Sequence, residues 1–272
     1  MLSVIETGRE EALMLKGLYT AYTGMINEQN RMDTMTNNLA NASTVGFKKE
    51  GATSQSFDSI LTVKIKDQSI GLQNVQKLGT NNPGVKIGEN YTDFGQGSFR
   101  ITDNTYDLAL AGEGFFAIEF TNKAGETSTM YTRAGQFTLN KDGYLVTEDG
   151  DYVLSTQNNR IRLNTLIDAK ISNDGTITQN GVAVAKIQVT DFEDYNYLEK
   201  YGETYYRPVE GAKTTTTDAQ VKSGYLEMAN VQVVSEMVNL IAITRAYESN
   251  QKIIQTYDES LGIAVSQLGR IQ

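Results

Sequence analysis

The side chains that most often carry out catalysis or bind metals are missing from this sequence. The chain of 272 residues contains no histidine and no cysteine. Histidine is the commonest general base and metal ligand, and cysteine supplies thiolate nucleophiles, disulfides and zinc sites. Only carboxylates, lysine, tyrosine and hydroxyl groups remain for chemistry. We therefore expect no enzyme activity, no metal site and no cofactor.

Two motifs resemble ligand-binding loops but fit simple turns better. Gly112-Glu113-Gly114 follows an apolar run as a dinucleotide-binding loop does, yet the third glycine is missing and the next residues have the pattern of a strand. The Asp-Gly pairs at 142–143, 149–150 and 174–175 could belong to calcium loops, but none has the ligand spacing of an EF-hand. Both motifs are interpreted as β-turns.

One segment combines carboxylates with aromatic rings. Glu193, Asp194 and Glu199 lie close to five tyrosines between positions 195 and 206. Such a patch could bind carbohydrate or hydrolyse it with paired carboxylates, so a secreted polysaccharide-binding protein or hydrolase is one alternative. Nothing in the sequence fixes a separation between two carboxylates, and an acidic aromatic surface or a subunit contact is preferred.

Charge and hydropathy exclude two further classes of partner. The chain has 33 acidic and 24 basic side chains, a net charge of -9, and no basic stripe, so nucleic acid is not an expected partner. No run approaches the roughly 20 apolar residues of a membrane-spanning helix, so direct membrane insertion is not expected. The N-terminus lacks the pattern of a cleaved secretory signal.

Long amphipathic helices are predicted at both ends of the chain. Apolar residues recur every seven positions from Leu15 to about Ser43 and again over 226–271, where a second column is interrupted by Glu236 and Asn250. This spacing is typical of coiled coils. The C-terminal helix carries more apolar surface than one N-terminal helix can cover, so we expect contacts with neighbouring subunits. The expected assembly interface is Leu18, Met25, Met32, Leu39, Leu226, Val233, Leu240, Tyr247, Ile254, Leu261 and Leu268.

The middle of the chain has the pattern of an antiparallel β domain, with short β-branched and aromatic runs separated by the Asp-Gly turns. The predicted fold class is therefore α+β. Residues 14–65 and 220–272 are predicted to form a discontinuous helical coiled-coil domain. A β-rich outer domain, residues 84–210, is inserted into it after a linker at 66–83. Residues 1–13 are expected to be a non-native leader, because codons for Arg9-Glu10-Glu11 can form a ribosome-binding site ahead of a start at Met14.

Several blocks, in order along the chain, resemble the flagellar basal-body rod and hook-basal-body protein family. They are residues 14–25, 37–48, 107–116, 131–137, 142–147, 224–231 and 245–250. The N-terminal family signature falls on Asn37, Asn38, Leu39, Ala40, Asn41, Gly46 and Phe47. Asparagines are poor interior helix formers and glycine permits a left-handed turn, so the helix is expected to end near Ser43.

The resemblance implies a structural subunit of the flagellar rod with no catalytic residues and no cofactor. In this family the paired terminal helices form an inner tube that transmits torque and encloses the export channel, and the β domain forms an outer layer. The implied partners are further copies of the chain, other rod and hook proteins and the flagellar type III export apparatus. The implied location is the basal body, reached by export across the cytoplasmic membrane without a cleaved signal.

Within the family, the distal rod subunit is the most similar type. A proximal rod subunit or a short hook-type subunit is the alternative inside the family, and a free-standing coiled-coil adaptor is an alternative outside it.

Overall fold

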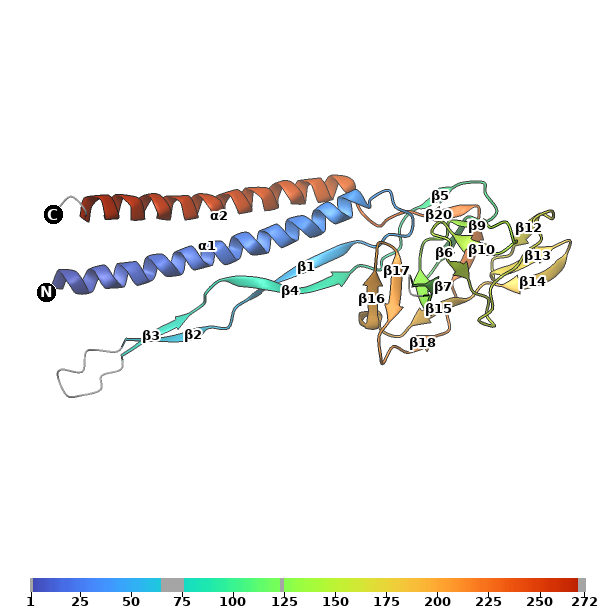
Figure 1. Cartoon of the computed structure of the whole chain (residues 1–272), viewed down its shortest axis with the longest axis horizontal. Coiled ribbons are helices and arrows are strands. Elements are labelled where there is room, and N and C mark those ends of the chain that lie inside the picture. Colours follow the sequence, from blue (N-terminus) through green and yellow to red (C-terminus); the bar gives the residue numbers. More distant parts are fainter. Residues whose placement is uncertain (1, 65–75, 123–124, 269–272) are drawn as a thin grey trace. The chain divides into compact units, whose positions relative to one another are not determined.

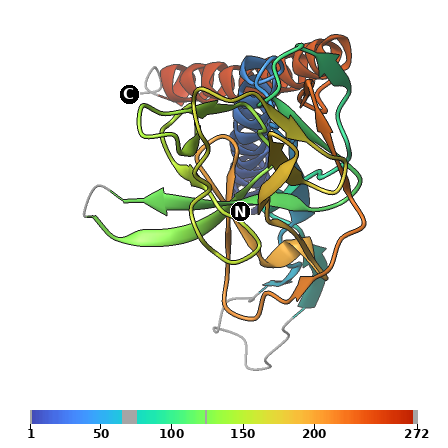
Figure 2. The same ribbon diagram turned by 90° about the vertical axis from the view of Figure 1, so that its right-hand side faces the viewer.

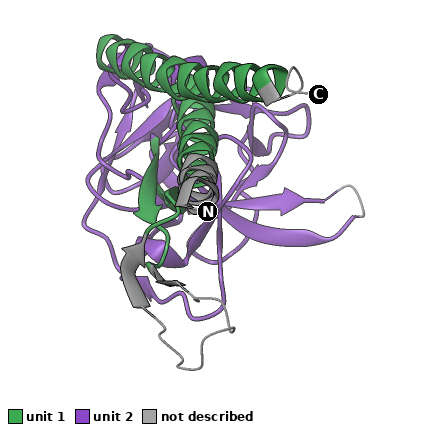
Figure 3. Ribbon diagram, turned by 90° about the vertical axis from the view of Figure 1, so that its left-hand side faces the viewer, with its two compact units in different colours: residues 1–37, 50–91, 234–272 green, residues 38–49, 92–233 purple. Residues whose placement is uncertain are grey.

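The computed structural model describes residues 2–64, 76–122 and 125–268, with side chains for 16–59, 82–122 and 125–267. The chain forms two compact units, and each is assembled from separate stretches of sequence (Figure 3). Unit 1 contains residues 1–37, 50–91 and 234–272, and unit 2 contains residues 38–49 and 92–233. Both chain ends therefore belong to unit 1.

Unit 1 combines two long helices with a long hairpin. The helices are α1 (Leu2–Ala40), whose last residues belong to unit 2, and α2 (Val233–Leu268). They run in opposite directions (Figure 1). The hairpin consists of β1 (Glu50–Ser56), β2 (Ile60–Lys64), β3 (Gln76–Asn81) and β4 (Val85–Thr92), in which β1 pairs with β4 and β2 with β3.

Helix α1 is covered on two sides within unit 1. Towards α2, a Cβ atom on Gly17 would lie 2.4 Å from the Tyr257 hydroxyl, and one on Gly24 would lie 3.0 Å from the Asn250 amide nitrogen. Towards the hairpin, the Asn27 amide donates to Ser54 Oγ at 3.0 Å and accepts from it at 3.1 Å. Glycines on one side and a buried amide on the other thus allow α1 to pack closely against both neighbours.

The predicted coiled coil is wrong. The described part of the chain has only two α-helices, one near each end, and it shows no coiled coil between them. Along α2 the less exposed residues do follow the predicted spacing, but among them only Glu236 and Ile243 are buried. Seven-residue spacing marks a stripe on a helix and does not specify its partner. Here α1 presents glycines where a coiled coil needs interlocking apolar side chains.

Unit 2 is built from antiparallel strands. Its largest sheet has the order β16-β17-β8-β7-β11-β10-β9, with β15 paired to β7 and β18 to β15. The β7–β8 hairpin extends beyond the rest of this sheet (Figure 2). The bounds are β7 Phe115–Thr121, β8 Thr127–Thr132, β9 Phe137–Leu139, β10 Leu145–Thr147, β11 Tyr152–Val153, β15 Val189–Phe192, β16 Leu198–Tyr201, β17 Tyr205–Pro208 and β18 Thr214–Thr215.

Smaller sheets complete the unit. A three-stranded sheet contains β12 (Ala169–Ile171), β13 (Thr176–Gln179) and β14 (Val182–Lys186). Two pairs bring sequence-distant segments together: β6 (Leu108–Ala111) with β19 (Gln220–Ser223), and β5 (Phe99–Ile101) with β20 (Tyr225–Glu227). A short 3-10 helix, η1 (Tyr195–Tyr197), precedes β16.

The hydrophobic core of unit 2 lies on both faces of β7. Successive residues of a strand point to opposite faces, and residues 115–118 are all fully buried. On one face Phe116 packs edge-on against Phe137, with ring centres 5.3 Å apart. On the other face Phe115 joins a cluster that includes Tyr131, Phe192 and Tyr206. A central strand buried on both sides makes unit 2 a layered β structure.

Four local predictions differ from the structure. Helix α1 begins at Leu2 rather than at Leu15 and ends at Ala40 rather than near Ser43, and α2 begins at Val233 rather than at Leu226. Leu226 lies on β20, opposite Arg100 of β5, and is buried there. Its match to the seven-residue column is therefore accidental, because strand pairing decides the local conformation. Strand β3 lies inside the segment 66–83 that was predicted to be a linker.

Replacing Phe116 with alanine is expected to lower the free energy of unfolding by about 3–5 kcal/mol, because a fully buried ring is exchanged for a cavity. The matched control is Leu166→Ala. That side chain is 92% exposed, and its removal should change the same free energy by no more than about 0.5 kcal/mol. Denaturant unfolding followed by near-ultraviolet circular dichroism measures both, and equal losses would contradict the assigned core.

Candidate functional site

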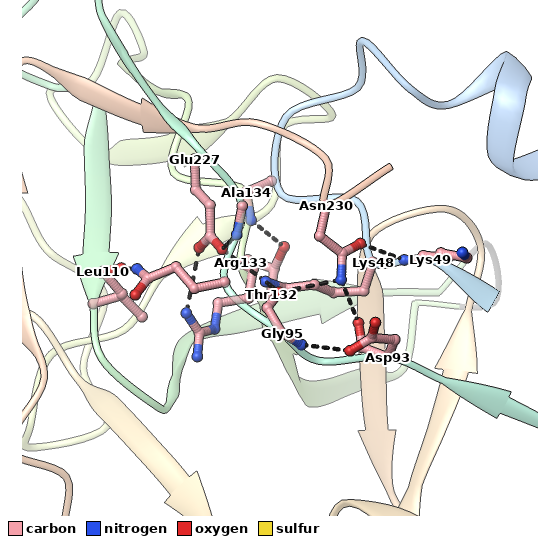
Figure 4. Close-up of polar contacts among 12 residues, drawn as sticks. Lys48, Lys49, Asp93, Gly95, Leu110, Thr132, Arg133, Ala134, Glu227 and Asn230 are labelled. Carbon is pink, nitrogen blue, oxygen red and sulfur yellow. Dashed lines mark hydrogen bonds and ion pairs between the residues drawn. The ribbon is translucent and has the colours of Figure 1, made fainter. Parts of the chain in front are cut away.

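The most heavily buried charges of unit 2 form one cluster. Lys48 Nζ lies 2.7 Å from Glu227 Oε1, and Arg133 Nη1 lies 3.3 Å from Glu227 Oε2 (Figure 4). All three side chains are at most 3% exposed. Glu227 therefore has a cation at each of its two carboxylate oxygens and no access to bulk water.

Backbone groups complete the hydrogen bonding of this cluster. Gly97 N donates to Glu227 Oε1 at 2.9 Å, and Lys48 Nζ donates to the Gly95 carbonyl at 2.8 Å. The Arg133 guanidinium also lies over the Phe115 ring, 5.3 Å from its centre. Burying a carboxylate is costly unless it is paired and hydrogen-bonded, and Glu227 is both.

Asn230 extends the cluster through its side-chain amide. Its Oδ1 accepts from Lys49 N at 2.7 Å, and its Nδ2 donates to the carbonyls of Asp93 at 2.8 Å and Gly95 at 3.2 Å. One amide thus joins backbone from residues 49, 93 and 95. Close by, Gly46 N donates to the Glu227 carbonyl at 2.8 Å.

The cluster gathers the chain segments through which unit 2 continues into unit 1. The chain passes from one unit to the other after residues 37, 49, 91 and 233. Lys48 and Lys49 precede one of these points, Asp93 and Gly95 follow another, and Asn230 precedes the last. Inside unit 2, these contacts hold together the segments that lie next to the points where the chain passes into unit 1. We call this set, Lys48, Asp93, Gly95, Arg133, Glu227 and Asn230, the charged junction.

The charged junction is suited to holding segments together rather than to chemistry. Burial lowers the pKa of Lys48, and attraction to Glu227 opposes that shift. The three buried charged side chains, Lys48, Arg133 and Glu227, have almost no solvent-exposed surface through which a substrate could approach. Sequence reasoning missed this junction because these three residues are far apart in the chain and form no local motif.

The family signature residues lead into this junction. Gly46 has a φ of +70°, and a Cβ there would lie 2.2 Å from Ala134 N, so no other residue fits without strain. Phe47 is fully buried, and Lys200 Nζ lies 4.2 Å from the centre of its ring. Asn38 is buried, and the side chains of Leu39 and Asn41 are half-buried. The remaining two, Asn37 and Ala40, are exposed.

The predicted assembly residues are spread along the helices, apart from Leu226 on β20. On α1, Leu18, Met25, Met32 and Leu39 are half-buried. On α2, Leu240, Tyr247 and Ile254 are half-buried, while Val233 and Leu261 are exposed, at 40% and 41%. The side chain of Leu268 lies outside the described residues. Contact with other subunits by these residues stays a prediction.

Among the described residues, no group of three or more acidic side chains is placed to hold a metal ion. No helix in the described segments is long and apolar enough to cross a membrane.

Two side chains of the acidic tyrosine segment have structural partners in unit 2. Tyr195 donates to Asp191 at 2.7 Å and packs within the core cluster around Phe115. Glu199 pairs with Arg207 on the neighbouring strand. These contacts give several of the charged and aromatic groups of this segment structural partners.

Comparison with known families matches three segments of the chain. The N-terminal segment, residues 18–48, matches the family described as flagella basal body rod protein. Residues 109–181 match the flagellar hook protein FlgE/F/G D1 domain, and residues 222–268 match the C-terminal part of flagellar basal body rod FlgEFG proteins.

Whole-chain relatives agree with these matches. The FlgG basal-body rod protein of Bacillus subtilis is 35% identical over 269 residues, 91% of this chain and 97% of the relative. The chain belongs to the flagellar basal-body rod protein family. The FlgF rod protein of Caulobacter vibrioides is 34% identical, over 95% of this chain and all of the relative. The hook-basal body complex protein FlhO of Bacillus subtilis is 32% identical over the same shares.

The chain is accordingly a structural rod protein of the FlgG type, and its family is not an enzyme family. Each of the three matched segments contributes one charged residue to the junction: Lys48, Arg133 and Glu227. The segments that identify the rod protein as a family member therefore meet at one buried carboxylate.

Replacing Glu227 with glutamine is expected to lower the free energy of unfolding by about 3–5 kcal/mol, because two buried cations lose their counter-charge. The matched control is Glu199→Gln. Its pair with Arg207 is roughly half-exposed and should contribute no more than about 1 kcal/mol. Urea unfolding at neutral pH measures both variants. Similar losses for the two would show that the junction does not need its charge.

A second polar group gives unit 2 a pH dependence. Tyr205 Oη lies 2.9 Å from Asp149 Oδ2 and 3.0 Å from Asp151 Oδ2. Burial and the two carboxylates raise the pKa of the Tyr205 phenol, with the Thr147 hydroxyl acting in the opposite direction. The folded state keeps this proton where the unfolded state has lost it, so the free energy of unfolding falls as pH rises above about 10.

Tyr205→Phe is therefore expected to flatten the loss of stability at alkaline pH. The contribution of Tyr205 is fully present below about pH 10 and disappears above it, so the parent and the variant should differ most in slope there. Urea unfolding at a series of alkaline pH values measures this slope. An unchanged slope would show that Tyr205 does not hold its proton in this way.

Proposed function

We propose that the rod protein polymerises through its terminal helices into a helical tube of identical subunits, with the β-rich unit as the outer layer. The supporting observation is the exposed apolar surface of α2. Val234 is 77% exposed, Val238 60% and Ile241 55%. These residues are three and four positions apart, and they lie off the stripe that contains the half-buried Leu240, Tyr247 and Ile254.

Further exposed apolar side chains lie on both helices. Met237, Ile253, Ile263 and Val265 of α2 are between 42% and 69% exposed, and Tyr19, Tyr22 and Ile26 of α1 are between 38% and 62% exposed. Clustered exposed apolar side chains are typical of a protein interface. An open polymer of identical chains covers it in every subunit except those at the ends.

The same proposal assigns the remaining properties of the subunit. The tube transmits torque, encloses the export channel and contacts other rod and hook proteins. The chain reaches it through the flagellar type III apparatus without a cleaved signal and has no catalytic activity. The domain boundaries at residues 14–65, 66–83, 84–210 and 220–272 stay part of this proposal, with the distal rod as the position of the subunit. A proximal rod position or a short hook-type subunit is the alternative within the family.

Ile241→Asp is the expected assembly-defective variant. Its side chain is 55% exposed, so the free energy of unfolding of the isolated chain should change by no more than about 0.5 kcal/mol. In the polymer, the new carboxylate would enter an apolar contact in every subunit, and assembly should fall by about tenfold or more. Sedimentation of polymerised chain and swimming of cells that carry the variant measure the effect.

The control for this experiment is Gln255→Asp, which adds a carboxylate at an exposed polar position of the same helix. It should assemble and support swimming like the parent. Normal assembly of Ile241→Asp chains would show that this face of α2 is not an assembly surface.

A further inference from the structure

One end of unit 2 carries an acidic patch with exposed aromatic rings. Tyr197 and Tyr201 are 45% and 44% exposed, and Val209, whose N–H donates to the Tyr197 carbonyl at 2.9 Å, is 47% exposed. Glu203, in the turn between β16 and β17, and Glu210, next to Val209 at the other end of this hairpin, are also exposed. Residues 193–210 contain five carboxylates against two cations. We call Tyr197, Tyr201, Glu203, Val209 and Glu210 the acidic patch.

Strand alternation keeps this patch on the surface. On β16, Leu198 packs against the core cluster and Lys200 lies over the Phe47 ring. Neighbouring residues of a strand point to opposite faces, so Tyr201 faces away from that core. Tyr197 ends η1, just before the strand. Tyr201 is held from one side by Phe120, with ring centres 5.3 Å apart. The Tyr201 ring is therefore held in place before binding, and little of its side-chain freedom is lost when it binds.

A second patch combines exposed aliphatic side chains with cations. Lys141, Arg162 and Val184 line one open hollow of about 620 Å³, together with Asp142. Leu166 follows Thr165 of that lining and is 92% exposed, while Val182 is 67% and Val184 46% exposed. The charged residues that line this hollow are two cations, Lys141 and Arg162, and one carboxylate, Asp142. We call Lys141, Arg162, Leu166, Val182 and Val184 the basic patch.

The two patches belong to opposite ends of the same unit. Strands β16 and β17 lie at one end of unit 2, and the sheet β12–β14 lies at the other (Figure 1). One patch cannot reach the other within one chain. A contact between unlike patches on identical chains is heterologous, and when its rotation does not close it produces an open helical filament.

We propose that the acidic patch of one copy binds the basic patch of the next, so that the β units of the rod protein join head to tail. The proposal rests on the self-assembly proposed above and adds a second contact surface, separate from the helices. Exposed leucine and valine side chains meet tyrosine rings, and Lys141 and Arg162 meet Glu203 and Glu210. Complementary charge fixes the register and rejects the like-with-like pairing of two acidic or two basic ends.

Charge reversal on the full-length chain tests the pairing. The basic-end variant is Lys141→Glu with Arg162→Glu, and the acidic-end variant is Glu203→Lys with Glu210→Lys. All four side chains are exposed, so thermal unfolding of each variant should match the parent. Each variant alone places like charges together and should raise the concentration needed for polymer formation about tenfold. The chain that carries all four substitutions should assemble like the parent, and an equimolar mixture of the two variants should also recover.

The control removes the same amount of positive charge elsewhere. Lys170→Glu with Arg100→Glu changes two exposed cations outside both patches and should assemble normally. A defect in this control equal to that of the basic-end variant would mean that net charge, and not the patch, governs assembly. The proposal is overturned if either patch variant assembles like the parent, or if the fourfold variant assembles no better than the single-end variants.

The helix experiment separates this inference from the proposed function. If Ile241→Asp blocks assembly while the patch variants assemble normally, the helical contact stands and the patch contact fails. If Ile241→Asp assembles normally while the patch series shows loss and recovery, the patch contact stands without the helical one.

Discussion

The structure depends on one buried carboxylate. Glu227 has no access to water, and an ionised group in that position must have counter-charges and hydrogen-bond donors around it. Lys48 and Arg133 supply the counter-charges, and Gly97 supplies a backbone donor. These partners come from segments that are far apart in the sequence, so satisfying a single side chain fixes several stretches of unit 2 at once. Desolvation of the three charges offsets much of their mutual attraction, so removing one partner costs more than the net contribution of the arrangement to stability.

The helices of unit 1 differ from the charged junction, because only part of their apolar surface is covered within the chain. Gly17 and Gly24 let α2 approach α1 closely, and Asn27 ties α1 to the hairpin through Ser54. One stripe of α2 is partly covered, and another, with Val234, Val238 and Ile241, is left open. Apolar surface is thus divided between contacts inside the chain and surface available to other chains. The proposed self-assembly requires both, since a subunit must fold and then bind further copies.

Much of the local structure could be predicted from single residues. The turns after Asp142, Asp149 and Asp174 are confirmed, since Gly143, Gly150 and Gly175 all have positive φ. The two long helices follow from periodicity, although their inner ends were misplaced by a few residues. Strand β1 was missed because Glu50–Ser56 has almost no apolar residues. Its extended conformation comes from pairing with β4 and not from an apolar pattern of its own. The charged junction could not be predicted from local sequence, because Lys48 and Glu227 become ion-pair partners only when the fold brings them together.

The separation of those two residues has a consequence for the order of folding. Lys48 and Glu227 are 179 positions apart, so their ion pair closes a loop that contains most of the chain. Such a contact is among the last that a growing chain can make, because the entropy of closing the loop is lost before the contact is gained. During synthesis from the N-terminus, Lys48 has no counter-charge until almost the entire polypeptide exists. An incomplete chain therefore lacks the junction, and only a nearly full-length molecule can reach the native arrangement of unit 2.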